Sequence, residues 1–122
     1  MLIIPLIEIC EKDTELVGLL TDEVGLKVSE FDANNTNGAP YVCWQIIDAN
    51  PEQYLSAPSD MDSIYAQIDI YAATKGSTRQ IARLLRKNIE EYCYIEDYTG
   101  VVRDSETNLY RIRIDSRWCE EP

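Results

Sequence analysis

One stretch of the sequence, residues 63–93, limits the possible folds more than any other. It opens with Ile64–Ala72, where apolar and polar residues alternate, and a period of two is typical of a strand with one buried face. From Ser77 on, apolar residues recur every three or four positions, which predicts a long amphipathic helix over Ser77–Cys93. Ser77 and Gln80 have the spacing of a capping box. A strand that leads into such a helix predicts a sheet with the helix packed on one face.

Alternating runs elsewhere in the chain complete the predicted sheet. The last run has isoleucines at every second position and charged side chains, Arg111 and Arg113 among them, at the positions between. The predicted class is therefore α+β, a mainly antiparallel sheet with helices on one face and a charged, open second face. The expected strands are Tyr41–Ile47, Ile64–Ala72, Val101–Arg103 and Leu109–Trp118, with a short edge strand near Val24, Leu26 and Val28.

The N-terminal segment predicts two short helices. Apolar residues within Ile3–Lys12 fit one helical face, and Asp13 or Thr14 can cap a second helix that runs to Leu20. The first residues lack the basic segment and cleavage site of a signal sequence, and they are too short to span a membrane. At 122 residues we expect one domain over 1–122.

A loop between two of the strands is a candidate contact element. Residues 48–62 contain two prolines and four acidic residues, and we expect them to form the extended tip of a hairpin. They bring little apolar surface to offset the entropy of ordering, so the loop should be mobile in an isolated subunit and ordered on assembly. The candidate contact residues in it are Asn50, Gln53 and Tyr54.

Charge is unevenly distributed along the chain. The net charge is −11, and residues 1–74 carry two basic against 13 acidic residues, whereas the remainder is balanced. A DNA-binding chain normally has a basic surface, so the composition argues against holding DNA. Four basic residues nevertheless gather on the predicted helix. They are Arg79, Arg83, Arg86 and Lys87.

Two interpretations of these helix cations remain open. They can form a plain solvated face, or they can meet the acidic first half of a second copy. Head-to-tail contacts of the second kind close into rings when the rotation permits. Arg111 and Arg113, on the charged face of the sheet, are further candidate contact residues.

Residues suited to catalysis or metal binding are scarce. There is no histidine, the commonest general base and metal ligand, and the four cysteines form no C-x-x-C pair. We interpret the cysteines as reduced thiols of an intracellular protein. Lys75-Gly76-Ser77-Thr78 lacks the spacing of a phosphate-binding loop. We therefore predict no enzyme, no cofactor and no metal site.

Three segments, taken in order, resemble a known family. They are Ala39–Val42, Tyr65–Ala72 before a helix, and the closing Tyr110–Asp115. Together with the N-terminal helices and the proline-bearing loop, this order is similar to the tail completion proteins of long-tailed bacteriophages, the Gp17-like group. The resemblance runs from about Leu6 to Trp118 and includes no active-site motif.

The resemblance implies a structural virion protein with the fold of tail terminators. Such a protein would form a hexameric ring, contact the tail tube and the head connector, and let DNA pass without binding it specifically. It would be located in the virion, and in the host cytoplasm during assembly. The competing hypothesis is an acidic, DNA-mimic inhibitor of a host protein, and it stays open on the sequence alone.

Overall fold

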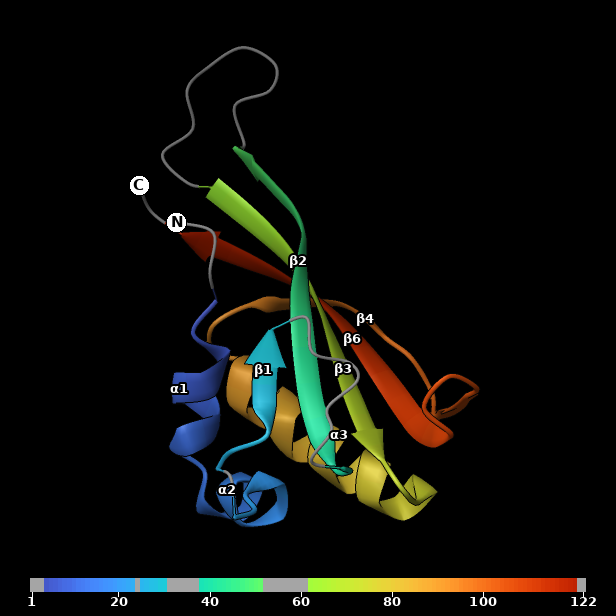
Figure 1. Cartoon of the computed structure of the whole chain (residues 1–122). Coiled ribbons are helices and arrows are strands. Elements are labelled where there is room, and N and C mark those ends of the chain that lie inside the picture. Colours follow the sequence, from blue (N-terminus) through green and yellow to red (C-terminus); the bar gives the residue numbers. More distant parts are fainter. Residues whose placement is uncertain (1–3, 24, 31–37, 52–61, 121–122) are drawn as a thin grey trace.

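The computed structural model describes residues 4–23, 25–30, 38–51 and 62–120. The predicted α+β class and the mainly antiparallel sheet are confirmed (Figure 1). The elements, in chain order, are α1 (Leu6–Glu11), α2 (Thr14–Leu20), β1 (Val28–Glu30), β2 (Tyr41–Pro51), β3 (Asp62–Ala72), α3 (Lys75–Ile89), β4 (Tyr94–Tyr98), β5 (Val102–Asp104) and β6 (Leu109–Glu120).

The sheet has the strand order β1-β2-β3-β6-β4, and β5 pairs with β6 beside this path. The long strands pair antiparallel, β2 with β3 and β3 with β6, in agreement with the predicted mainly antiparallel sheet. β1 is an edge strand, as expected, but it begins at Val28, the last residue of the predicted segment, and pairs parallel with β2. A parallel neighbour requires a crossover that no local pattern in the sequence reveals.

The expected strands have somewhat different bounds in the structure, β2 most of all, and one strand, β4, was not expected. β2 continues to Pro51 and pairs with β3 there, so residues 48–51 belong to the hairpin strands rather than to a loop. A register shift between Ile46 and Asp48 interrupts the alternation, which is why the pattern ends early in the sequence. β4 has no counterpart among the expected strands, yet it pairs with β6. The rest of the predicted loop, 52–61, lies outside the described residues.

Helix α3 begins earlier and ends earlier than its apolar spacing predicts. Thr74 is the N-cap, and its hydroxyl accepts a hydrogen bond from the Ser77 backbone N–H at 3.1 Å. The predicted capping box is therefore wrong, because Ser77 already lies inside the first turn, where its side chain cannot cap. The helix ends at Ile89, and Cys93 lies beyond a turn.

The two N-terminal helices form as expected, and Asp13 is the cap between them. Its carboxylate accepts hydrogen bonds from the backbone N–H groups of Glu15 and Leu16, at 2.9 and 3.2 Å. α1 starts after Pro5, which lacks the N–H that a helix interior would need. None of the helices in the described part of the chain combines the length and the apolar surface that a membrane crossing requires.

One core holds these elements together on a single side of the sheet. Ile68, Leu85 and Ile112 belong to the same buried cluster, as the alternation of β3 and β6 and the spacing of α3 predict. α1 and α2 add Leu6, Ile9, Leu16 and Leu20 to that cluster. Figure 1 shows α3 behind the strands, with α1 beside β1 and α2 below it at the same edge of the sheet. The opposite face of the sheet, which carries the charged side chains of β6, is therefore available for contacts.

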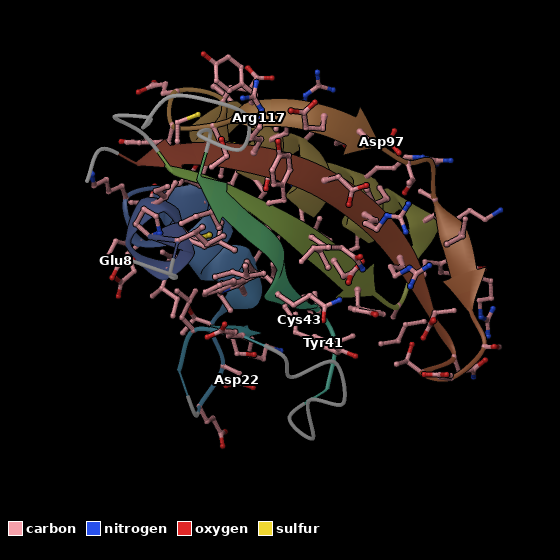
Figure 2. The ribbon with its side chains drawn as sticks, turned by 90° about the horizontal axis from the view of Figure 1, so that it is seen from above. Glu8, Asp22, Tyr41, Cys43, Asp97 and Arg117 are labelled. Atoms are coloured by element: carbon pink, nitrogen blue, oxygen red, sulfur yellow. The ribbon has the colours of Figure 1, made fainter. Side chains whose placement is uncertain are left out.

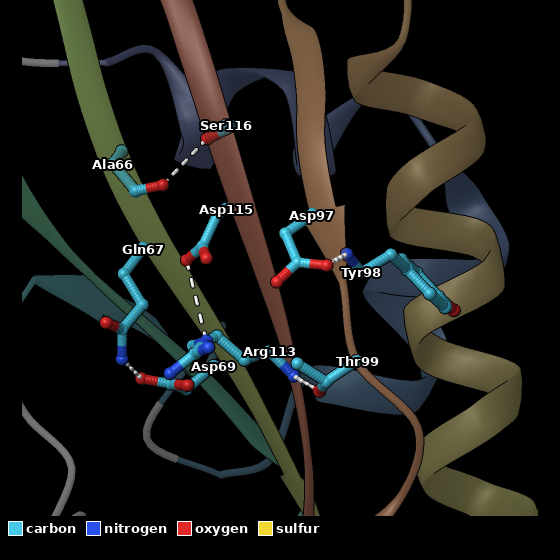
Figure 3. Close-up of polar contacts among 9 residues, drawn as sticks. All are labelled: Ala66, Gln67, Asp69, Asp97, Tyr98, Thr99, Arg113, Asp115 and Ser116. Carbon is cyan, nitrogen blue, oxygen red and sulfur yellow. Dashed lines mark hydrogen bonds and ion pairs between the residues drawn. The ribbon is translucent and has the colours of Figure 1, made fainter.

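A small buried polar network joins β3 to β6 within this core. The Ser116 hydroxyl donates to the Ala66 carbonyl oxygen at 3.0 Å and accepts from the Trp118 indole N–H at 2.8 Å (Figure 3 draws the first). Ser116 and Trp118 are both almost fully buried. The hydroxyl therefore satisfies two groups that water cannot reach.

Replacing Ser116 with Ala should lower the free energy of unfolding by about 1–3 kcal/mol, because the buried indole N–H loses its acceptor. Urea denaturation measures the loss. In a Trp118→Phe background the same replacement should cost clearly less, since no indole donor is left to strand. An equal cost in both backgrounds would show that the serine acts through packing alone.

Candidate functional site

The structure divides the predicted contact residues between two surfaces. Arg79, Arg83, Arg86 and Lys87 are all exposed on α3, on the helix side of the sheet. Arg111 and Arg113 lie on β6 and point to the opposite, open face, since their neighbours Ile112 and Ile114 are buried under the helices. Asn50 lies in β2 near the hairpin tip, whereas Gln53 and Tyr54 are outside the described residues.

Arg86 differs from the other three helix cations because it is already engaged within the chain. Its Nε lies 3.0 Å from a carboxylate oxygen of Glu90, and its guanidinium lies 4.9 Å from the ring centroid of Tyr98. Among the described residues, no ion pair or hydrogen bond holds Arg79, Arg83 or Lys87. We call these three residues the basic flank of α3.

Two acidic residues beside α3, Asp13 and Glu15, already accept hydrogen bonds from side chains of that helix. Asn88 donates to the Asp13 carboxylate at 2.7 Å, and Gln80 contacts Glu15 at 3.5 Å. The hydrogen bonds from Asn88 and from the backbone lower the pKa of Asp13, and the charge of Lys87 adds to the effect. α2 therefore borders one side of α3, and Arg86 with Tyr98 of β4 borders the other.

The open face of the sheet carries charged, polar and aromatic side chains. Figure 2 shows Arg117 and Asp97 on the β6–β4 side of the sheet, away from Tyr41 and Cys43 of β2. Arg117 pairs with Glu96 at 2.7 Å and lies over the Tyr94 ring at 4.7 Å. These contacts hold the Arg117 guanidinium within the chain, whereas the sequence pattern alone predicts that it is available to a partner.

One end of this face carries a second cluster that the sequence analysis missed. Tyr41 and Tyr71 are opposite each other across β2 and β3, and their rings stack with centroids 4.9 Å apart. Cys43 completes the buried cluster, with Ala39 and Leu109 packed against it. Burial raises the pKa of Tyr71 to about 12, so its hydroxyl stays protonated. The register of β2 against β3 brings these residues together, and the sequence pattern alone does not predict that register.

Near the middle of the face, Asp69 is buried among charged neighbours. It is 7% exposed, and Gln67 donates to one of its oxygens at 2.9 Å (Figure 3). The other oxygen has no hydrogen-bond partner among the described residues. Burial raises the pKa of the Asp69 carboxyl, while the hydrogen bond from Gln67 and the charges of Arg111 and Arg113 act in the opposite direction.

The other half of the open face is hollowed. A hollow of about 500 Å³ lies over β3 and β6, where Ala66 and Ser116 form part of its wall. Exposed Ile47 and acidic Glu96 border it. The remaining lining residues are Tyr65, Gln67, Arg113 and Asp115. Its mixed lining suits contact with another polypeptide more than capture of an apolar small molecule.

The described side chains form no cluster typical of metal binding or nucleophilic catalysis. In the described ranges, no group of three or more His, Cys, Asp or Glu side chains is placed to hold a metal ion. All four cysteines are free thiols, and burial raises the pKa of Cys10 and of Cys93 to about 12. Such thiols stay protonated at neutral pH and are poor nucleophiles. The two contact surfaces are therefore the candidate site.

Comparison with known protein families gives a match over nearly the whole chain. The family model described as tail completion protein gp17 matches residues 5–121. This span begins at the N-cap of α1 and passes the end of β6, so it contains every described helix and strand. No curated protein is significantly similar to the chain.

Proposed function

Because this chain belongs to the tail completion protein family, a family of structural proteins of phage tails, we propose that it completes the tail and joins it to the head connector. It acts there as a ring, of six copies, around the channel through which DNA passes. Its partners are copies of itself, the tail tube and the head-connector proteins. It is located in the virion, and in the host cytoplasm during assembly.

The family match over residues 5–121 is the observation that carries this proposal. A family of structural tail proteins also favours a non-enzymatic role. The competing DNA-mimic hypothesis relies on acidity alone, and the acids beside α3 are partly occupied by side chains of their own chain. The family match and the hydrogen bonds of these acidic residues favour a structural role in the tail over that of a DNA-mimic inhibitor.

The net charge of −11 supports a place beside a DNA channel. A wall with an excess of acidic residues repels phosphates, so passing DNA is not retained. The hairpin tip around Asn50, with Gln53 and Tyr54 beyond it, is the proposed contact to the lumen or to the adjoining ring. The basic flank of α3 is the proposed contact between copies.

The proposed function is tested by joining heads to tails. A phage that encodes this chain, with its gene disabled, should produce filled heads and separate tails that do not join. Adding the purified protein to that lysate should restore infectious particles, counted as plaques. Joined, infectious particles without the protein would contradict the proposed function. Electron microscopy of the purified protein and of tail ends tests the ring.

A further inference from the structure

One aromatic ring at the end of the sheet lies close to two cations. Tyr110 of β6 is opposite Arg103 of β5, and its side chain lies on the same face of β6 as that of buried Ile112. The Arg103 guanidinium lies 5.2 Å from the centroid of the Tyr110 ring. Nζ of Lys75, the first residue of α3, lies 5.9 Å from the same centroid. We call Lys75, Arg103 and Tyr110 the Tyr110 cluster.

The positive charges of this cluster have no acidic partner within the described part of the chain. Lys75 and Arg103 are both exposed, and no ion pair there involves either of them. Arg103 donates a hydrogen bond to the side chain of Asn108, which is neutral. Lys75 precedes Arg79 by four residues, so the cluster continues the basic flank along α3. Like charges that lie close together repel, so this surface favours an acidic partner.

The outer face of α1 has the complementary composition. Ile7 is 40% exposed, and Glu8 and Glu11, also exposed, are three residues apart on the same side of the helix. Like charges at this spacing repel, and no cation in the described ranges forms an ion pair with either carboxylate. Lys12, which follows Glu11, lies instead 5.9 Å from the centroid of the Tyr92 ring. α1 therefore presents an apolar side chain beside two carboxylates.

The two surfaces lie at opposite ends of the subunit. In Figure 1 α1 borders β1 at one edge of the sheet, whereas the turn between β5 and β6 projects at the other end. Figure 2 likewise shows Glu8 on the opposite side of the molecule from that turn. We propose that the Tyr110 cluster receives the outer face of α1 from a second copy of this chain. Such a contact is heterologous, and its repetition closes a ring where the rotation permits.

This inference rests on the proposed function and deepens it. It assigns the acidic side of the contact between copies to α1, and it adds the Tyr110 cluster to the basic flank. The carboxylates of α1 meet Lys75 and Arg103 in charge-assisted hydrogen bonds. Ile7 packs against the Tyr110 ring and is removed from water. A protein partner fits better than DNA, because DNA offers no counterpart to the Ile7 contact and the net charge of −11 repels its phosphates.

An exchange of charge between the two surfaces tests the contact. Lys75→Glu with Arg103→Glu should weaken self-association of the purified protein by about tenfold, because two attractions become repulsions. Sedimentation at low salt measures the association. Glu8→Lys with Glu11→Lys, the α1 pair, should weaken it by a similar factor. All four substitutions in one chain should restore association to within about threefold of wild type. Circular dichroism checks that each variant is folded.

Glu23 and Asp97 supply the matched control, since both are exposed acids outside α1. Glu23→Lys with Asp97→Lys changes the net charge as much as the α1 pair does. It should neither weaken association nor rescue the reversal of Lys75 and Arg103. Rescue by this control pair, or failure of the α1 pair to rescue, would overturn the inference. Binding of a short DNA duplex that the reversal of Lys75 and Arg103 abolishes would overturn it as well.

The joining assay separates this inference from the proposed function. If the wild type is monomeric in solution, the same variants are scored there by the same rescue pattern. A wild type that joins heads to tails, without rescue by the α1 pair, overturns the inference alone. A wild type that fails to join them overturns the proposed function instead.

Discussion

Replacing Leu85 with Ala should lower the free energy of unfolding by about 2–5 kcal/mol, the largest single effect we expect on stability. Leu85 is fully buried where α3 packs on the sheet, in the cluster that also holds Ile68 and Ile112. Truncation leaves a cavity that the long strands β3 and β6 cannot close, because their backbones are fixed by pairing along eleven positions. Urea denaturation followed by circular dichroism measures the loss.

The neighbouring Leu84 is the matched control for this measurement. It has the same side chain on the same helix, but it is only partly buried at the edge of the core. Leu84→Ala should therefore cost clearly less than Leu85→Ala, since less apolar area is removed from contact. Equal losses would show that the buried face of α3 has been assigned to the wrong residues.

The parts of the fold that local sequence pattern determines were predictable. Alternation in Ile64–Ala72 and Leu109–Trp118 identified β3 and β6, because successive side chains of a strand point to opposite faces and the apolar ones lie on the core side. Helical spacing identified Ile81, Leu85 and Ile89 as the buried side of α3. The cap of α2 was predicted as Asp13 or Thr14, and the structure has Asp13 there. In these cases the physical cause acts within a few residues.

The parts that depend on pairing between distant residues were not predictable. The parallel pairing of β1, the register that stacks Tyr41 on Tyr71, and the strand β4 all arise from tertiary contacts. The residues of β4 are mostly exposed, so they leave no apolar alternation to detect. The cap at Thr74 was missed because Ser77 offers a similar local pattern three residues later.

The candidate contact residues also differ in whether local sequence pattern or contacts between distant residues determine their surroundings. That the four basic residues lie on an exposed part of α3 followed from their spacing relative to the buried positions. That Arg86 is engaged by Glu90 and Tyr98 required the position of β4, which the sequence did not reveal. The basic flank therefore contains three residues, Arg79, Arg83 and Lys87, rather than the four that the sequence suggests.

Reversing both Arg83 and Lys87 to Glu should weaken self-association by up to about thirtyfold, and head-to-tail joining with it. Each exposed ion pair contributes at most about 1 kcal/mol, so the loss of two pairs gives a factor of this size. The fold should survive, because both side chains are exposed and away from the buried positions of α3. Raising the salt should weaken wild-type association as well, since the Debye length is only about 10 Å at 0.1 M.

Arg86→Gln is the matched control for this reversal. Its guanidinium is held by Glu90 and lies over Tyr98 within the chain, so its loss should reduce stability slightly and change association little. Sedimentation at two salt concentrations measures the self-association of the double reversal and of the Arg86 variant. If the double reversal associates as the wild type does, or if the Arg86 variant is the more defective, the three cations form no contact between copies. The flank would then be plain solvated charge, because nothing else in its position on α3 requires a partner.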